Sequence, residues 1–123
     1  MSIQSYQDLQ VWQNGMDLAE QAYQLTQSFP KEALFGLTSQ IRRAATSIPA
    51  NIAEGWGRQT TGEFRQFLHN AQGSLRELET HLLLALRLNL ATKDQIQPLL
   101  EMCQVLGRQL INLQRSLSAR KRS

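Results

Sequence analysis

Apolar residues recur in four segments of the chain at alternating steps of three and four, the spacing that places them on one face of an α-helix. In residues 9–29 two neighbouring stripes share this spacing, and we expect the first to face the core and the second to widen that face. The first stripe is Leu9, Trp12, Met16, Ala19, Tyr23 and Thr26, and the second is Val11, Gly15, Leu18, Ala22, Leu25 and Phe29. Pro30 ends this helix, because the residue before a proline avoids helical dihedral angles.

A second helix is predicted over about residues 31–56. Its apolar stripe is Leu37, Ile41, Ala44, Ala45, Ile48, Ile52 and Trp56. Pro49 removes one backbone donor inside this segment. The stripe keeps its phase on both sides of Pro49, so we expect one kinked helix, with two short helices as the alternative. Gly55 and Gly57 mark the predicted C-terminus, where left-handed dihedral angles cost glycine little.

Capping boxes predict where the other two helices begin. Thr60 pairs with Glu63, and Thr92 pairs with Gln95, since each side chain can satisfy a free amide of the other residue. The stripe of the third helix is Phe64, Leu68, Ala71, Leu75, Leu78, Leu82 and Ala85. That of the fourth is Ile96, Leu99, Cys103, Leu106, Leu110, Leu113 and Leu117.

The connections between these segments are short, which forces successive helices to lie antiparallel. The sequence therefore predicts an all-α protein, an antiparallel up-down-up-down four-helix bundle. We expect residues 1–119 to form this single domain and residues 120–123 to form a basic C-terminal tail. No segment resembles a targeting signal. The longest apolar run, Leu82–Leu86, is far shorter than a membrane span. We expect a soluble, cytoplasmic protein with no membrane partner.

Charge is distributed unevenly along the 123 residues, although the net charge is only +3. Residues 1–41 sum to −3 and residues 42–123 to +6. The charged residues after Glu101 are all basic: Arg108, Arg115, Arg120, Lys121 and Arg122. A basic half with a basic tail favours an anionic partner, nucleic acid before membrane. An ordinary solvated tail explains the same residues equally well. Arg42 and Arg58 are second candidates for nucleic-acid contact.

Catalytic and metal-binding patterns find no support in the sequence. Di-iron bundles use Glu-x-x-His pairs, whereas Glu77 and His81 are four residues apart and His69 has no acid within one turn. No glycine-rich loop precedes a Lys-Ser/Thr pair, and no serine pairs with a histidine. The single cysteine, Cys103, occupies a core position, where a thiol acts as a small hydrophobe. We predict no enzyme activity, no metal or cofactor and no small-molecule substrate.

The segment 40–58 combines two further patterns on one helix. A polar stripe consists of Gln40, Arg43, Ser47, Asn51, Glu54 and Arg58. A face of small residues includes Ala50 and Ala53, and small residues allow close approach of another backbone. We interpret both as a polar network or subunit interface. A solvated face with internal pairs such as Glu54–Arg58 is the equal alternative. Leu82–Leu90 is apolar nearly all round, which is typical of a helix buried on more than one side.

Several motifs resemble the "four helix bundle protein" family. They are Tyr6–Trp12, Phe29–Glu32, Gly36–Ala44, Ser47–Gly55, Gly57–Arg58 and Gly73–Glu79. The resemblance covers roughly residues 6–90, and Ser47–Gly55 (SIPANIAEG) is its most specific part. Tyr6 replaces a usual phenylalanine and Phe35 a usual tyrosine. The family includes proteins encoded in intervening sequences of bacterial large-subunit ribosomal RNA genes. It is also related to the accessory variability determinant of diversity-generating retroelements.

The resemblance implies a bundle that assembles as a ring-shaped homopentamer. In the retroelement relatives, the ring binds a reverse transcriptase and its template RNA through basic surface. Our leading hypothesis is therefore a non-catalytic oligomeric scaffold that binds structured RNA or an RNA–protein complex, as an accessory protein of a reverse transcriptase would. The alternative is a protein-interaction adaptor that binds no nucleic acid.

Overall fold

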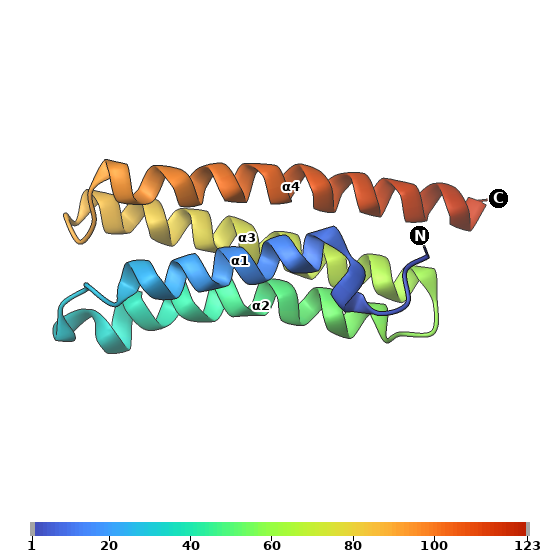
Figure 1. The fold of residues 1–123 in the computed structure, drawn as a ribbon, viewed down its shortest axis with the longest axis horizontal. Coiled ribbons are helices and arrows are strands. Elements are labelled where there is room, and N and C mark those ends of the chain that lie inside the picture. Colours follow the sequence, from blue (N-terminus) through green and yellow to red (C-terminus); the bar gives the residue numbers. More distant parts are fainter. Residues whose placement is uncertain (1, 123) are drawn as a thin grey trace.

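The computed structural model describes residues 2–122, with side chains for residues 2–119. Most of the chain forms four long helices: α1 (Gln10–Thr26), α2 (Ser39–Trp56), α3 (Thr61–Arg87) and α4 (Lys93–Arg122). They lie side by side, each running opposite to the one before, and both chain ends lie at the same end of the bundle (Figure 1). Three short helical segments precede α1 or α2: η1 (Tyr6–Asp8), η2 (Lys31–Ala33) and η3 (Leu34–Thr38).

Each long helix packs mainly against two others. α1 contacts α2 and α4, and α3 also contacts α2 and α4, so the four helices surround one core. Turns of a few residues join α2 to α3 and α3 to α4. The predicted all-α, antiparallel four-helix bundle is confirmed.

The predicted core stripes of the last two helices are confirmed. All seven residues of the α3 stripe, Phe64 to Ala85, are buried. In the α4 stripe only Leu113 is not fully buried. Polar side chains join these two helices beside the core, where Gln114 Nε2 donates to Gln72 Oε1 at 2.8 Å. α4 continues as a helix to Arg122, through most of the segment that we assigned to a tail.

We expected the stripe from Leu9 to Thr26 in α1 to face the core and its neighbour to widen that face, and this is wrong. The flanking stripe from Val11 to Phe29 is buried throughout, whereas in the first stripe Met16 and Tyr23 are 46% and 42% exposed. Both stripes have helical spacing, so the pattern alone could not show which of them is buried in the core. The residues of α2 beside Met16 and Tyr23 include Thr46, Pro49 and Ala50, which are too small to cover these long side chains.

The second helix also departs from its predicted course. We expected one kinked helix from about residue 31, but a 3-10 turn and a five-residue π-helical segment come first and α2 begins at Ser39. The break lies at Gly36, whose dihedral angles (φ −112°, ψ −109°) are not helical. Pro49 lies inside α2, which continues through it. Pro49 is buried beside Gly15 of α1, where an added Cβ atom would lie 3.5 Å from the proline ring, an ordinary van der Waals distance.

Gly55 and Gly57 were expected to supply left-handed dihedral angles, and this is wrong. Gly55 is inside α2, and Gly57 caps the helix with φ −77°. The need for glycine at 55 is steric, because a Cβ atom there would lie 2.6 Å from Cβ of Phe67. Among the described non-glycine residues, Asn89 has a positive φ, 59°, in the α3–α4 turn.

Side-chain caps begin α3 and α4 where the sequence predicted them. The box at α4 is complete, since Thr92 N–H donates to Gln95 Oε1 and Gln95 N–H donates to Thr92 Oγ1. At α3, the Glu63 amide donates to Thr60 Oγ1, but the Glu63 carboxylate accepts from the Thr60 hydroxyl rather than from its amide. Only the first half of that box is therefore confirmed.

The contact between α1 and α4 closes the bundle and is the least extensive of its four contacts between adjacent helices. Asn14 Nδ2 donates to Gln109 Oε1 at 2.7 Å across it. Beside this bond lies a hollow of about 540 Å³ between the helices, lined by Asn14, Asp17, Gln21, Pro98, Glu101, Met102 and Val105. The core that all four helices share consists mainly of buried leucine, isoleucine and alanine side chains. Within residues 2–122, no helix combines the length and hydropathy of a membrane span.

Candidate functional site

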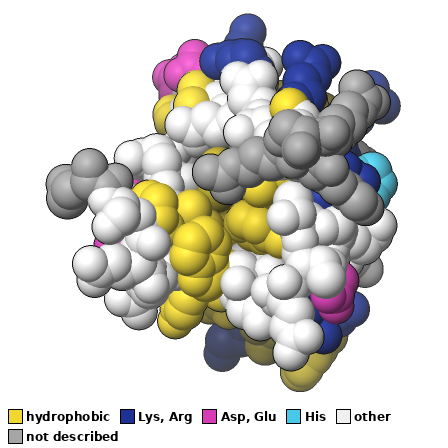
Figure 2. All heavy atoms as spheres, turned by 90° about the vertical axis from the view of Figure 1, so that its right-hand side faces the viewer, with side chains coloured by type: hydrophobic (Ala, Val, Ile, Leu, Met, Phe, Trp, Pro, Cys, Tyr) yellow, Lys and Arg dark blue, Asp and Glu magenta, His cyan; other side chains and the backbone are white. Residues whose placement is uncertain are grey.

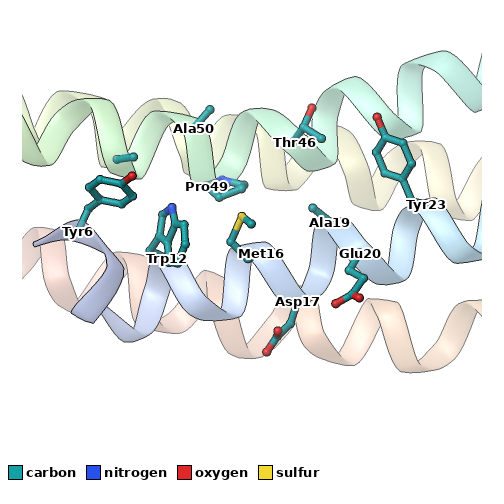
Figure 3. Close-up of a pocket in the computed structure, with 11 residues that line it drawn as sticks. Tyr6, Trp12, Met16, Asp17, Ala19, Glu20, Tyr23, Thr46, Pro49 and Ala50 are labelled. Carbon is teal, nitrogen blue, oxygen red and sulfur yellow. The ribbon is translucent and has the colours of Figure 1, made fainter.

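An apolar groove of about 620 Å³ lies between α1 and α2. One wall consists of Tyr6, Trp12, Met16, Ala19 and Tyr23, and the other of Thr46, Pro49, Ala50 and Ala53. In Figure 3 the Trp12 and Met16 side chains rise from α1 toward the small residues of α2. Tyr6 and Trp12 meet edge to face, with ring centroids 5.3 Å apart. We call this feature the α1–α2 groove.

Acidic side chains line the outer side of the α1–α2 groove. Asp17 and Glu20 both contribute to its lining and are exposed. Figure 3 shows both carboxylates on the side of α1 away from α2. Asp17 also borders the hollow between α1 and α4, together with Glu101. The exposed face of α1 is therefore acidic between two hollows.

The predicted polar stripe makes its described hydrogen bonds within α2 and the turn that follows it. The Ser47 hydroxyl donates to the Ala44 carbonyl, Asn51 Nδ2 donates to the Ser47 carbonyl, and Arg58 Nη2 lies 2.8 Å from Glu54 Oε2. Gln40 and Arg43 are exposed. These bonds favour the solvated-face interpretation for Ser47, Asn51, Glu54 and Arg58. A role in contact between subunits stays a prediction.

The small-residue face of α2 is only partly covered by α1. Ala50 is exposed and Ala53 is half-buried, and both lie in the α1–α2 groove rather than in the core. The leucine-rich end of α3 is similar. Leu82 and Ala85 are buried, while Leu83, Leu84 and Leu88 are 46%, 42% and 56% exposed. Both places predicted as an interface thus present apolar surface to the outside of the bundle.

The predicted nucleic-acid-binding residues fall into four groups. Arg108 and Arg115 are exposed on α4. Arg58 is engaged twice, by Glu54 and by the ring of Phe67, whose centroid lies 4.7 Å from its guanidinium carbon. Arg42 is half-buried at the start of α2. The side chains of Arg120, Lys121 and Arg122 lie outside the described residues, so nothing in the structure tests these three.

The end of the bundle that holds both chain ends is shown in Figure 2. Hydrophobic side chains are visible in the middle of this end, in a hollow between the helices. Lys and Arg side chains lie at separate places around its edge, with Asp and Glu among them. Outside the grey atoms, the visible end therefore presents mixed charge.

Residues 7–112 match the family model described as 23S rRNA-intervening sequence protein. The chain belongs to this family. The match covers most of the bundle and confirms the resemblance that the motifs indicated. A search of curated proteins finds no match to the chain.

A solved structure supports the same family assignment. It is a crystal structure of a protein of unknown function from the S23 ribosomal protein family of Bacteroides thetaiotaomicron. The two chains are 25% identical and superpose with a TM-score of 0.76. The match covers 84% of this chain and 96% of the other. The bundle architecture is therefore shared, while neither match states a molecular activity.

The turn between α1 and α2 holds a feature of this intervening-sequence family member that the sequence patterns did not indicate. Phe35 is 94% exposed, more than any other large apolar side chain described. A hollow of about 400 Å³ beside it is lined by Tyr23, Leu34, Phe35, Thr38, Ser39, Arg42, Arg43 and Thr46. Phe35 belongs to none of the four stripes, so periodicity passed over it. The residue after it, Gly36, was the available signal for an irregular turn.

The described metal-ligating side chains of this family member are not clustered. Among the described side chains, no three His, Cys, Asp or Glu residues lie close enough together to hold a metal ion. Cys103 is buried in the core. Burial, with a smaller contribution from the Glu79 carboxylate, raises the pKa of this thiol to about 12, although the Arg76 guanidinium opposes the rise. Both Arg76 and Glu79 belong to α3, so their proximity could not be seen from residues near 103. A thiol with this pKa is a poor nucleophile.

Proposed function

We propose that this protein is a non-catalytic helical scaffold that assembles with copies of itself and binds structured RNA, free or within an RNA–protein complex. The observation that carries the RNA part is the basic face of α4. Arg108 and Arg115 are exposed and seven residues apart, so they lie on one side of the helix. α4 continues to Arg122, another seven residues along, and has no acidic residue after Glu101.

A line of basic positions on one helix suits the phosphates of a nucleic-acid backbone. At about 1.5 Å per residue, positions seven apart are separated by roughly 10 Å along the helix. Contacts of this kind position a protein on RNA but do not read sequence. Both family names, 23S rRNA-intervening sequence protein and S23 ribosomal protein, refer to the ribosome or its RNA, which supports RNA as the ligand.

Self-assembly is supported by apolar surface that the chain leaves uncovered. The α1–α2 groove lies between α1 and α2, whereas the exposed residues Leu83, Leu84 and Leu88 lie at the C-terminal end of α3. Two different faces can meet in a heterologous contact, and such contacts close into rings. Five subunits are proposed from the family resemblance. A ring would repeat the basic face of α4 once per subunit, so weak contacts could sum through avidity.

The experiment is binding of a structured RNA across a salt series. Each phosphate neutralised contributes about −0.9 to the log–log slope on duplex DNA and about −0.7 on single strands. We expect an Arg108→Gln/Arg115→Gln variant to bind more weakly and with a flatter slope. The matched control is Arg87→Gln/Lys93→Gln, which removes two exposed bases near the α3–α4 turn and should change little.

The basic tail is tested by an Arg120→Gln/Lys121→Gln/Arg122→Gln variant. We expect this variant to bind RNA more weakly while its subunit number, measured by light scattering, is unchanged. If neither the tail variant nor the α4 variant differs from the parent protein, the basic half of the chain is a solubilising surface and the RNA proposal fails.

The α1–α2 groove favours a second candidate, a protein-interaction adaptor without nucleic-acid binding. An open apolar groove with small residues on one wall suits an apolar segment of another protein. A reverse transcriptase is the protein partner that the family resemblance implies, and it fits either candidate. Identifying the RNA and protein that co-purify from the native host separates them, because an adaptor would retain protein but no RNA.

A further inference from the structure

The turn between α1 and α2 places an exposed aromatic ring beside two guanidinium groups. Phe35, Arg42 and Arg43 line the same hollow of about 400 Å³. Phe35 is 94% exposed, so nearly its whole ring surface is available to a ligand. Hollows of roughly 300–1,000 Å³ are typical of ligand sites. The combination differs from the basic face of α4, where arginines stand without an exposed aromatic neighbour.

Arg42 is held in place by two residues of α1. Its Nε donates to Thr26 Oγ1 at 2.9 Å, and its guanidinium carbon lies 4.6 Å from the centroid of the Tyr23 ring. Within the described part of the chain, no hydrogen bond or ion pair engages its two terminal nitrogens. Arg42 is thus fixed through Nε and the ring face, and the terminal nitrogens can donate to a ligand.

The charge of this turn is positive. Lys31, Arg42 and Arg43 outnumber Glu32, and Lys31 and Arg42 also line a second, smaller hollow of about 240 Å³. Thr38 lies in the wall of both hollows and is only 3% exposed. Its Oγ1 is buried without a hydrogen-bond partner in the described structure. This hydroxyl is therefore buried behind the wall of the site, with its hydrogen-bonding capacity unused.

We propose that this turn binds single-stranded RNA, with an unpaired base stacked on Phe35 and the adjoining phosphate held by Arg42 and Arg43. The inference rests on the proposed function and adds a second RNA contact, which prefers single strands to duplex. Sequence-tolerant recognition of single strands combines aromatic side chains, on which bases stack, with basic groups along the backbone. A paired base inside a helix cannot reach Phe35, so this site distinguishes loops and ends from duplex.

The probe is a short fluorescein-labelled single-stranded RNA, compared with the same strand annealed to its complement. Loss of one base–aromatic stacking contact should weaken single-strand binding by Phe35→Ala about tenfold. Duplex binding should not change. Phe35→Trp should restore single-strand binding, because an indole also stacks. The matched control is Val105→Ala, which removes an exposed apolar side chain of α4 that lies outside this turn and outside the surfaces proposed for assembly.

Arg43→Gln tests the phosphate contact. The Arg43 side chain is exposed and makes no described hydrogen bond, so this substitution should not disturb folding. We expect it to flatten the salt dependence of single-strand binding by an amount typical of one phosphate.

Three outcomes overturn the inference in distinguishable ways. If Phe35→Ala binds the single strand as tightly as the parent, while Arg108→Gln/Arg115→Gln binds more weakly, only this site is wrong. If Phe35→Ala changes the subunit number in light scattering and leaves RNA binding intact, the turn is a contact between copies of the chain. If the parent protein binds neither probe at low salt, the proposed function fails together with this site.

Discussion

Phe67 occupies the space that a side chain at Gly55 would need. A Cβ atom built on Gly55 lies 2.6 Å from Cβ of Phe67, and it would lie 3.0 Å from Cδ1 of Phe64. Both phenylalanines belong to the first turns of α3, so this glycine sets how closely α2 and α3 approach after their short turn. Trp56 meets Phe64 edge to face beside this contact, with ring centroids 5.9 Å apart.

Substitution of this glycine should destabilise the protein. Gly55→Ala forces α2 and α3 apart, and overpacking of this kind typically costs about 1–3 kcal/mol. Gly73 is the control, because it lies in the middle of α3 and a Cβ atom added there would meet nothing within 4 Å. Gly73→Ala should stabilise the protein by about 0.5–1 kcal/mol, since alanine favours helix interiors. Urea unfolding of both variants measures the two effects, and equal changes would contradict the steric explanation.

Core truncation should be costly on both sides of the α3–α4 contact. Leu75 is fully buried and Leu106 is 1% exposed, so Leu75→Ala and Leu106→Ala should each lower the free energy of unfolding by about 2–5 kcal/mol. Val105→Ala is the comparison, because Val105 is next to Leu106 but 44% exposed. Chemical denaturation at one fixed protein concentration gives the values. A near-neutral change in the free energy of unfolding for Leu75→Ala would mean that this stripe of α3 does not face the core.

Assembly should depend on the α1–α2 groove. Ala50→Glu or Ala53→Glu places a carboxylate in an apolar groove whose outer side already carries Asp17 and Glu20. We expect light scattering to show a cyclic oligomer for the parent and smaller species for both variants. Asn70→Glu adds the same charge on an exposed part of α3 and should assemble normally. A monomeric parent protein at micromolar concentration would refute the proposed ring.

The Cys103 thiol should make stability fall at high pH. Its pKa is raised from 9.0 to about 12 in the folded state, mainly by burial. Between these values the unfolded chain loses this proton first, so the free energy of unfolding decreases as pH rises above about 9. Other groups titrate in the same range, so the test compares the parent with Cys103→Ala, whose pH dependence should be shallower. Rapid alkylation of the folded protein at pH 8 would contradict the burial of the thiol.

Thr38→Val should stabilise the isolated protein. The Thr38 hydroxyl is buried without a described partner, and an unsatisfied buried polar group costs about 1–3 kcal/mol. Valine has nearly the same shape and no such group. Thermal unfolding of the RNA-free protein should therefore show a higher midpoint. A lower midpoint would mean that the hydroxyl is hydrogen-bonded in solution.

The sequence predicted the buried residues best where a helix carries a single apolar stripe. The α3 stripe from Phe64 to Ala85 is the only apolar set before the leucine-rich end, and all its members are buried. In α1, Met16 and Tyr23 have the same spacing as Leu18 and Ala22, and burial depends on the size of the residues that α2 presents. Periodicity describes one helix at a time and contains no information on its neighbour.

The candidate site residues likewise depend on contacts between helices, which the spacing of residues in the sequence does not show. Glu54 and Arg58 are four residues apart, so their pairing could be read from the sequence, but Phe67, which covers the other side of Arg58, lies beyond a turn. Arg42 depends on Tyr23 and Thr26 in a different helix. Phe35 lies in an irregular segment and matched no helical pattern. Each of these arrangements exists only after two helices have packed.

The open contact between α1 and α4 has a consequence for how the bundle folds. The contacts of α2 with α1 and α3 join neighbours in sequence and need only short loops to close, which favours rapid formation. The contact between Asn14 and Gln109 instead joins residues 95 apart. We expect this contact between α1 and α4 to form last. The hollow of about 540 Å³ beside it leaves few packed side chains to stabilise it. During native-state hydrogen exchange, the amides of α1 and α4 should therefore lose protection before those of α2 and α3.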